Sequence, residues 1–447
     1  MRFLLGPLCD KYGARILYML VLCAAAIPTA CTGLVQTATG LTVCRLFIGF
    51  AGGTFVMCQY WCSGMFTKDV VGTANAVAAG WGNLGAAVAQ LIMGSLLFPL
   101  FKWLFSQGEG VTNEEVAEQA WRTVSIVPAV IAFVSGIVMF FISDDAPRGN
   151  YKQLKRQGEM KDVHMGNSFM SGLKNVNSWL LFVQYACCFG VEMTMNNAVA
   201  LYFRDEFGQS TESAAAIASI FGFMNIFARG LGGFCSDFGN KKAGMRGRLF
   251  VQTLLLFMEG SLILVFSTTK SLATAIVVMS MFSLFVQMAE GSSYGIVPYV
   301  DPPITGSISG IVGAGGNVGA VAFTFGFRQL SYVGAFRLMG AVAIFSSTLS
   351  VFIFVQNHPG LIFEGRISPD DDCADETSAI KQQLALSEVS DGEDDDNGVD
   401  FVPGVLHLRN CSMKETSANH YRHSSSKGEY DVELSSESQM HVEDFSC

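Results

Sequence analysis

The chain has 447 residues, of which 50% are hydrophobic and only 15% are charged. Its mean hydropathy of +0.38 and its low charge exclude an ordinary water-soluble enzyme, a nucleic-acid-binding protein and a disordered scaffold. The net charge of −10 comes from residues 357–447, which hold 20 Asp and Glu against 6 Lys and Arg; the remainder carries +4. The composition therefore predicts a membrane protein with an acidic tail.

Apolar stretches long enough to cross a bilayer recur along the chain. A transmembrane helix needs about 20 mostly apolar residues. Ten stretches meet this requirement: 15–35, 40–62, 73–100, 121–142, 177–203, 213–235, 249–268, 272–298, 304–330 and 334–356. Residues 1–8 resemble the end of one more helix. The sequence thus predicts an all-α integral membrane protein with ten full helices and a stump.

Lys and Arg in the short loops predict the orientation of these helices. Alternate loops are basic, and they contain Lys11, Arg15, Lys68, Arg148, Lys152, Lys155, Arg156, Lys161, Lys174, Lys241, Lys242, Arg246 and Arg248. Because positive loops stay inside, we expect these loops and the tail to be cytoplasmic. The tail has too little apolar content to fold alone, so we expect it to be disordered. A phosphorylated regulatory tail is the functional alternative.

Two motifs occur twice, in the same order and at nearly the same separation. The pattern R-x3-G-x3-D stands at 2–10 and again at 229–237. The segment G-W-G-N-L-G-A at 80–86 is matched by A-G-G-N-V-G-A at 314–320. Parallel repeats joined by a basic loop are typical of major-facilitator transporters, whose substrate site lies at the membrane midplane between the halves.

The repeat also predicts the domain organisation. We expect an N-terminal transmembrane half at 1–142, a cytoplasmic connection at 143–176, a C-terminal half at 177–356 and the tail at 357–447. About 50 residues precede the second R-x3-G-x3-D motif, whereas one residue precedes the first. We therefore expect the first helix and most of the second to be missing from the N-terminal half, including a pore-lining helix.

Arg2 and Arg229 are the clearest candidates for a binding site. Each lies two helical turns before the Asp of its motif, so each is well inside its helix. An Arg near the bilayer centre costs about 2.5–3.5 kcal/mol on insertion scales, and pseudo-symmetry predicts that these two face each other. Two planar guanidinium groups suit a small planar oxyanion held between them. The alternative is a structural pairing of each Arg with Glu192 or Glu290.

The asparagines of the repeated glycine motif are further candidates. Glycines at this spacing let helices approach closely, which explains most of the motif but not Asn83 or Asn317. A buried amide needs hydrogen-bond partners and offers donors as well as an acceptor. We expect Asn83 to contact the substrate. For Asn317, substrate contact and a bond between helices remain equally open.

Several motifs resemble the nitrate/nitrite porter family, in its eukaryotic high-affinity branch. They are R-L-F-I-G-F from Arg45 with T-F-V-x-C-Q-Y-W from Thr54, A-G-W-G-N at 79–83, G-A-G-G-N at 313–317, and G-M-R-G-R-L at 244–249. The likeness covers about residues 2–330. It implies a twelve-helix major-facilitator transporter of nitrate, and often of nitrite. We expect the plasma membrane as its location. A small accessory membrane protein as partner is left open.

The resemblance also implies roles for individual residues. Arg2 and Arg229 fall at the two arginines that clamp the substrate in that family. Phe55, Tyr185 and Phe189 fall where bacterial relatives line the nitrate site with aromatic rings. From the residues alone, these three would be ordinary packing aromatics.

Coupling to protons would need an acid inside the membrane. Glu192 and Glu290 are the candidates, with Glu259 as a third, although each could instead neutralise a nearby charge. Phosphate-binding, zinc-protease and nucleophile-elbow motifs are absent from the sequence, so we expect no enzyme, cofactor or metal site. The expected partners are nitrate or nitrite and the lipid bilayer, not nucleic acid. The alternatives are a nitrate-binding sensor or partner subunit that does not transport, and a transporter of another small anion.

Overall fold

The computed structural model describes residues 1–106, 112–156, 164–356 and 358–362. Helices dominate these residues, and no β-strand occurs among them, which confirms the all-α prediction. The main helices of the first bundle are α1 Arg2–Tyr12, α2 Ala14–Cys31, α3 Ala38–Ile48, α4 Thr54–Met65, α5 Val71–Gln90, α6 Phe98–Phe105, α7 Asn113–Val124 and α8 Ile126–Ile142. Apart from 358–362, the predicted disordered tail lies outside the described residues.

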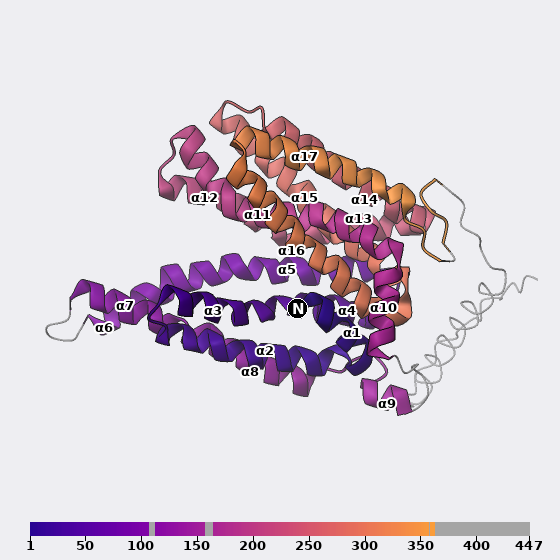
Figure 1. Cartoon of the computed structure of the whole chain (residues 1–447), viewed down its shortest axis with the longest axis horizontal. Coiled ribbons are helices and arrows are strands. Elements are labelled where there is room, and N and C mark those ends of the chain that lie inside the picture. The colour runs from indigo at the N-terminus through magenta and orange to yellow at the C-terminus, as the bar shows by residue number, and fades with distance from the viewer. Residues whose placement is uncertain (107–111, 157–163, 357, 363–447) are drawn as a thin grey trace, which may run out of the picture. The chain divides into compact units, whose positions relative to one another are not determined.

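A second bundle follows a connection that contains two short helices. These are α9 Tyr151–Arg156 and α10 Met165–Lys174. The second bundle comprises α11 Val176–Phe207, α12 Thr211–Phe223, α13 Ala228–Ala243, α14 Met245–Phe266, α15 Leu272–Val300, α16 Thr305–Gln329 and α17 Tyr332–Thr348. In Figure 1 the first bundle runs from indigo to purple and the second from magenta to orange.

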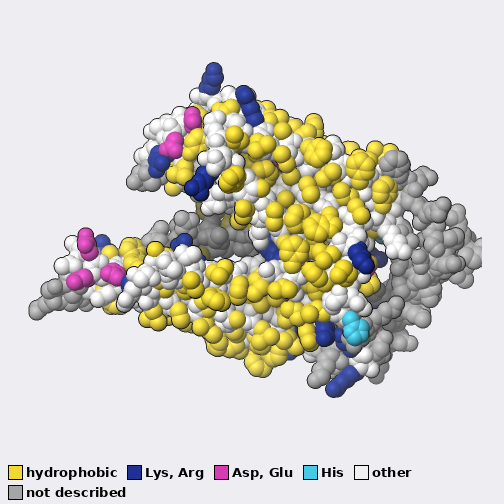
Figure 2. Space-filling model, viewed as in Figure 1, with side chains coloured by type: hydrophobic (Ala, Val, Ile, Leu, Met, Phe, Trp, Pro, Cys, Tyr) yellow, Lys and Arg dark blue, Asp and Glu magenta, His cyan; other side chains and the backbone are white. Residues whose placement is uncertain are grey.

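Eight helical stretches among the described residues are long and apolar enough to cross a membrane. They are Ala14–Leu34, Ala38–Met65, Asn113–Ile142, Ser213–Ala243, Met245–Phe266, Leu272–Val300, Pro302–Gln329 and Tyr332–Phe352. The two other predicted spans, 73–100 and 177–203, are also helical, but α11 carries the buried polar side chains of Gln184 and Glu192. Figure 2 shows hydrophobic side chains along the helices and most charged side chains near their ends.

Two of the predicted spans are interrupted by 3₁₀ turns. The span at 40–62 breaks at Gly49–Gly53, where three glycines weaken the helix. The span at 213–235 breaks at Met224–Ile226, where the side chain of Asn225 is buried and bonded to Glu192. The second interruption places Asn225 directly before α13, the helix that carries Arg229.

The two bundles meet where α1 packs on α16 and where α13 packs on α5. The central glycine of each R-x3-G-x3-D motif lies at one of these crossings. A Cβ atom on Gly6 would lie 2.3 Å from the carbonyl oxygen of Gly306, and one on Gly233 would lie 2.3 Å from that of Gly72. Any larger residue would therefore hold the two halves apart at these crossings.

The aspartates of the same motifs bond to helix starts in the opposite half. Asp10 accepts hydrogen bonds from the backbone N–H groups of Gly306, at 2.8 Å, and Ser307, at 2.9 Å, in the first turn of α16. Asp237 accepts in the same way from Thr73, at 2.6 Å, in the first turn of α5. A carboxylate is favourable at a helix N-terminus, so both halves are bonded together here. We call this end of the bundles the aspartate end.

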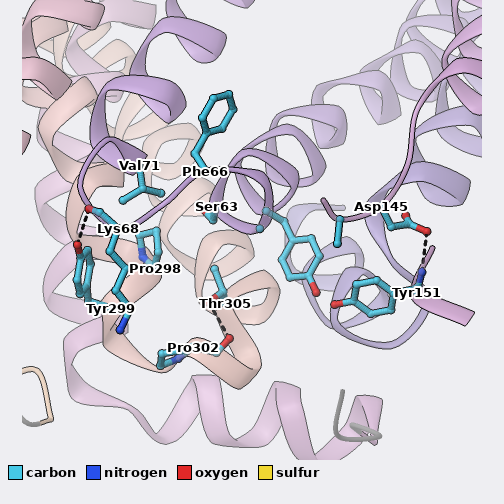
Figure 3. Close-up of a pocket in the computed structure, with 13 residues that line it drawn as sticks. Ser63, Phe66, Lys68, Val71, Asp145, Tyr151, Pro298, Tyr299, Pro302 and Thr305 are labelled. Carbon is cyan, nitrogen blue, oxygen red and sulfur yellow. Dashed lines mark hydrogen bonds between the residues drawn. The ribbon is translucent and has the colours of Figure 1, made fainter. Parts of the chain in front are cut away.

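Three further residues join the halves at the aspartate end. The Tyr299 hydroxyl donates to the backbone carbonyl of Lys68 at 2.8 Å, and Arg248 donates to the same carbonyl at 3.0 Å. Arg248 also forms an ion pair of 2.7 Å with Asp237. Figure 3 shows Lys68 and Tyr299 in the wall of a cavity of about 280 Å³ at this end, with Asp145 on its other side.

We predict that Gly233→Ala destabilises the protein by about 1–3 kcal/mol, because the new methyl group overlaps the backbone of α5. Thermal unfolding in detergent should show a lower midpoint than for the unchanged chain. Gly85→Ala is the matched control, since a Cβ there has no neighbour within 4 Å among the described residues. Equal midpoints for the two variants would contradict the assignment of Gly233 to a close crossing.

Candidate functional site

Arg229 lies fully buried near the start of α13, with two acids beside it. Its Nη1 atom is 2.5 Å from Oε2 of Glu290 and 3.7 Å from Oε2 of Glu192. Its Nη2 atom donates to the Tyr185 hydroxyl at 2.7 Å. For this arginine the structure therefore shows the acid pairing that the sequence left as the alternative interpretation.

Arg2 has different surroundings. It is buried at the start of α1, where Nε donates to the carbonyl of Gly52 at 3.2 Å and Nη1 donates to that of Gly313 at 2.5 Å. Among the described residues, its polar contacts are these two backbone carbonyls and no acid. The two motif arginines are thus equivalent in sequence but not in charge compensation.

Both arginines contact the same two aromatic rings. The guanidinium carbon of Arg2 lies 4.8 Å from the ring centre of Phe55 and 5.4 Å from that of Phe189. The corresponding distances for Arg229 are 5.8 Å and 6.0 Å. Both cations therefore lie against the same two rings, as the repeat predicts for residues that face each other. Tyr185 stacks on Phe189 with ring centres 5.5 Å apart and completes the predicted aromatic set.

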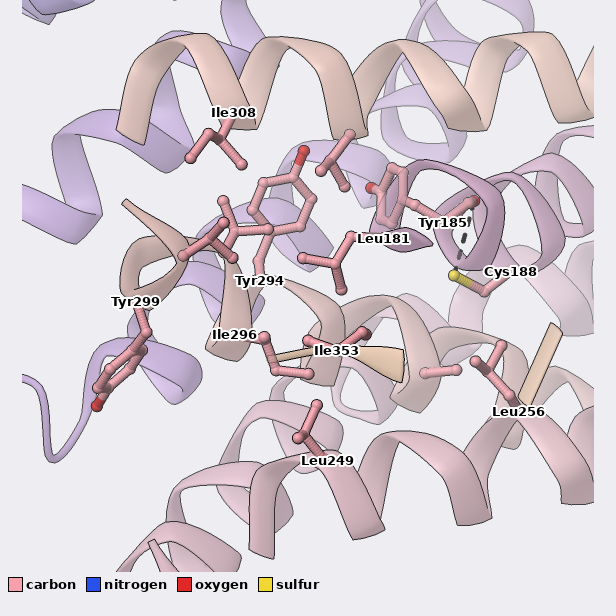
Figure 4. Packing of buried hydrophobic residues seen from close by; sticks show 14 of the residues in the cluster. Leu181, Tyr185, Cys188, Leu249, Leu256, Tyr294, Ile296, Tyr299, Ile308 and Ile353 are labelled. Atoms are coloured by element: carbon pink, nitrogen blue, oxygen red, sulfur yellow. Dashed lines mark hydrogen bonds between the residues drawn. The ribbon is translucent and has the colours of Figure 1, made fainter. Parts of the chain in front are cut away.

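Sequence reasoning missed one aromatic residue of this group. The ring of Tyr294 on α15 meets those of Phe55 and Tyr185 edge to face, each at 5.2 Å. Its hydroxyl donates to the carbonyl of Ser309 at 3.2 Å. Figure 4 shows Tyr294 beside Tyr185. The available signal was its spacing: Tyr294 is the fourth residue after Glu290, so both lie on one face of α15.

The repeated glycine motifs make room for this site. A Cβ on Gly80 of α5 would lie 3.1 Å from Cβ of Arg229, and one on Gly313 of α16 would lie 3.4 Å from Cδ of Arg2. A Cβ on Gly316 would lie 2.5 Å from the ring of Phe189. Gly80 and Gly313 therefore each allow close approach to the arginine of the other half. The predicted packing role is confirmed for Gly80 and for the three glycines of the second motif, but not for Gly82 and Gly85, which have no described neighbour within 4 Å.

In the part of the chain that the structure describes, the side chains of the asparagines form no hydrogen bond with either arginine. The Asn83 amide donates to Oε2 of Glu192 at 3.1 Å, so its partner in the structure is an acid. Asn225, which sequence reasoning missed, donates to Oε1 of Glu192 at 2.6 Å. Asn317 is exposed on α16 and lines a cavity with Arg2 and Arg45. Asn225 could have been noticed as a polar residue inside the apolar stretch 213–235.

The described residues contain no group of His, Cys, Asp or Glu that could hold a metal ion. The chemistry of the site is that of two guanidinium groups, two carboxyl groups and flat aromatic rings. Such a set can bind and release a small planar anion, because guanidinium donors match its oxygens and the rings keep water away.

Comparison with known proteins decides the family. Residues 1–324 match the Major Facilitator Superfamily. Over 420 residues the chain is 33% identical to high affinity nitrate transporter 2.5 of Arabidopsis thaliana, in an alignment that covers 93% of this chain and 78% of that protein. The chain belongs to the nitrate/nitrite porter family of the major facilitator superfamily.

Other relatives of this porter agree with the assignment. It is 37% identical over 364 residues to nitrate transporter 2.2 of Chlamydomonas reinhardtii, covering 79% of this chain and 69% of that one. Its fold resembles the crystal structure of the transporter FucP in the outward conformation, with a TM-score of 0.58 and 11% identity over 78% of this chain and 86% of that one. At that identity the likeness shows the fold alone.

Proposed function

We propose that this porter imports nitrate by alternating access and holds the anion between Arg2 and Arg229. The observation that carries the proposal is the shared contact of both guanidinium groups with the rings of Phe55 and Phe189. Relatives that are 33% and 37% identical are named nitrate transporters, which supports nitrate as the anion. Nitrite, also small and planar, fits the same chemistry.

The aspartate end is the cytoplasmic end in this proposal, and the membrane is the plasma membrane. The basic loops with Lys11, Arg15, Lys241 and Lys242 lie at this end, in keeping with the positive-inside rule. The bonds of Asp10 and Asp237 close the halves there. The cavity beside Glu192 lies nearer the other end, so this arrangement corresponds to an outward-facing state.

The charges of the site favour coupling to a proton. Arg2, Arg229, Glu192 and Glu290 are all buried, and their charges sum to zero when both acids are ionised. Nitrate adds one negative charge, which is costly in a site with a low dielectric constant. One proton on either carboxyl group restores neutrality. We therefore include symport with protons in the proposal.

The test is uptake of labelled nitrate by cells that lack their own nitrate transport and express this chain. We expect saturable uptake that is stronger at acidic external pH. Nitrite should compete with it, and a bulky organic anion should not, because the aromatic rings leave little room beside the arginines.

Absence of uptake, with the protein present at the cell surface, would contradict the proposal. Nitrate binding without uptake would then favour a sensor or a partner subunit. Uptake of a different small anion would keep the transport mechanism and change the substrate. Uptake that does not depend on external pH would refute proton coupling but leave the proposal of nitrate import standing.

A further inference from the structure

We propose that Glu192 is the group that receives the proton from outside, and that Asn83 and Asn225 position its carboxylate for this purpose. The inference rests on the proposed function, nitrate import with protons, and goes further by assigning the two candidate acids different roles. It also gives Asn83 a role other than substrate contact.

A polar cavity leads to Glu192. Its volume is about 480 Å³, and its polar lining consists of Asn83, Glu192, Asn196, Asn197, Ser219 and Asn225. Asn83 lies beyond the middle of α5, and Glu192, Asn196 and Asn197 lie at and beyond the middle of α11, away from the aspartate end. Ser219 on α12 and Asn225 in the following 3₁₀ turn complete the lining. A cavity of this size, lined by amides and a hydroxyl group, can hold several water molecules. Water there would bring protons to the carboxylate from the non-cytoplasmic side.

The two amides hold the Glu192 carboxylate from opposite sides. Asn83, on α5 of the first half, donates to Oε2 at 3.1 Å, and Asn225, in the second half, donates to Oε1 at 2.6 Å. An asparagine side chain carries both a donor and an acceptor, so it can bond to an ionised or to a protonated carboxyl group by turning over. Neutral amides therefore fix the position of Glu192 without fixing its charge.

The charged groups that face Glu192 explain why its protonation should favour nitrate. In the described part of the chain they are Arg229 of α13, 3.7 Å away, and Glu290 of α15, which pairs with the same guanidinium nitrogen. Glu290 is wholly buried and only 2.5 Å from Arg229, whereas Glu192 lines the polar cavity. A proton on Glu192 removes one anion from beside Arg229, so proton and nitrate should strengthen each other's binding.

Asn225→Asp tests the positioning role. The new carboxyl group would lie about as close to Glu192 as the present amide, and two such carboxylates hold a shared proton to higher pH. We expect the alkaline limb of the pH profile of nitrate uptake to move upward by about one pH unit or more. The matched control is Asn197→Asp, because Asn197 lines the same cavity but donates to the Met193 carbonyl of its own helix.

Two results would overturn the assignment to Glu192. The alkaline limb could shift equally in Asn225→Asp and Asn197→Asp, or it could fail to shift in Asn225→Asp although uptake by the unchanged chain depends on pH. Uptake by the unchanged chain that does not depend on pH would instead refute the proposed coupling.

If Asn225→Asp does not transport, Asn225→Cys tests the access of external water to this site by chemical labelling, which does not require transport. A membrane-impermeant thiol reagent applied outside should label it above the unchanged chain, because Asn225 lines the polar cavity. It should not label Ser293→Cys, since Ser293 is buried against Gln252, whose amide donates to its hydroxyl at 2.8 Å. Unlabelled Asn225→Cys at the cell surface would refute the external access.

Discussion

Replacing Arg229 by lysine is expected to lower nitrate uptake at least about 100-fold while the amount of protein at the cell surface stays the same. Lysine keeps the positive charge between Glu192 and Glu290. Lysine lacks the planar guanidinium fork, which donates to Tyr185, pairs with Glu290 and has a further donor for an anion. Disrupting one partner of a buried, charged interaction costs about 2–5 kcal/mol, which corresponds to this reduction. Initial rates of labelled uptake, normalised to surface protein, measure it.

Arg204→Lys is the matched control. Arg204 is exposed on α11 and pairs at 3.0 Å with its neighbour Asp205, so the same substitution there should leave uptake unchanged. Arg229→Ala should also abolish uptake, but it leaves Glu290 buried without its cation and is expected to lower expression too. Near-normal uptake by Arg229→Lys would refute the proposal that two arginines hold the anion.

The sequence predicts the meeting of the two arginines because depth in a helix depends only on spacing. In each R-x3-G-x3-D motif the Arg lies two turns from the Asp, and duplication places the two motifs symmetrically. The structure adds that Gly6 and Gly233 lie at the crossings between the halves and that both aspartates bond to helix starts across them. Each residue of this short motif therefore has its own role: the Arg places a charge inside the protein, the Gly allows a close helix crossing, and the Asp forms hydrogen bonds to the other half.

The partners of Arg229 could not be predicted in the same way. Whether Glu192 and Glu290 reach this arginine depends on how α11 and α15 are rotated about their axes, which side-chain packing determines. Both helices are buried on several sides, so their apolar pattern gives no preferred face. Asn225 reaches Glu192 from a 3₁₀ turn inside a stretch that reads as one continuous helix. The contact of Asn83 with an acid follows from the same unpredictable geometry.

Glu290→Gln is expected to abolish uphill, pH-dependent uptake while nitrate exchange is kept. With Gln at this position the remaining buried charges of the site, on Arg2, Arg229 and Glu192, sum to +1. Nitrate then neutralises the site without a proton, so its binding no longer requires one. Vesicles loaded with unlabelled nitrate should take up labelled nitrate at all pH values tested. Empty vesicles should not accumulate it in response to an acidic exterior.

Glu259→Gln provides the matched control for this prediction. Glu259 is as fully buried as Glu290, but it lies on α14 and forms no ion pair with either arginine in the described part of the chain. If charge balance beside Arg229 sets the coupling, this variant keeps uptake that rises with external acidity. If Glu259→Gln loses coupling and Glu290→Gln retains it, the coupling carboxyl group is on α14. The charge-balance argument would then be wrong, even though Arg2 and Arg229 could still bind the anion.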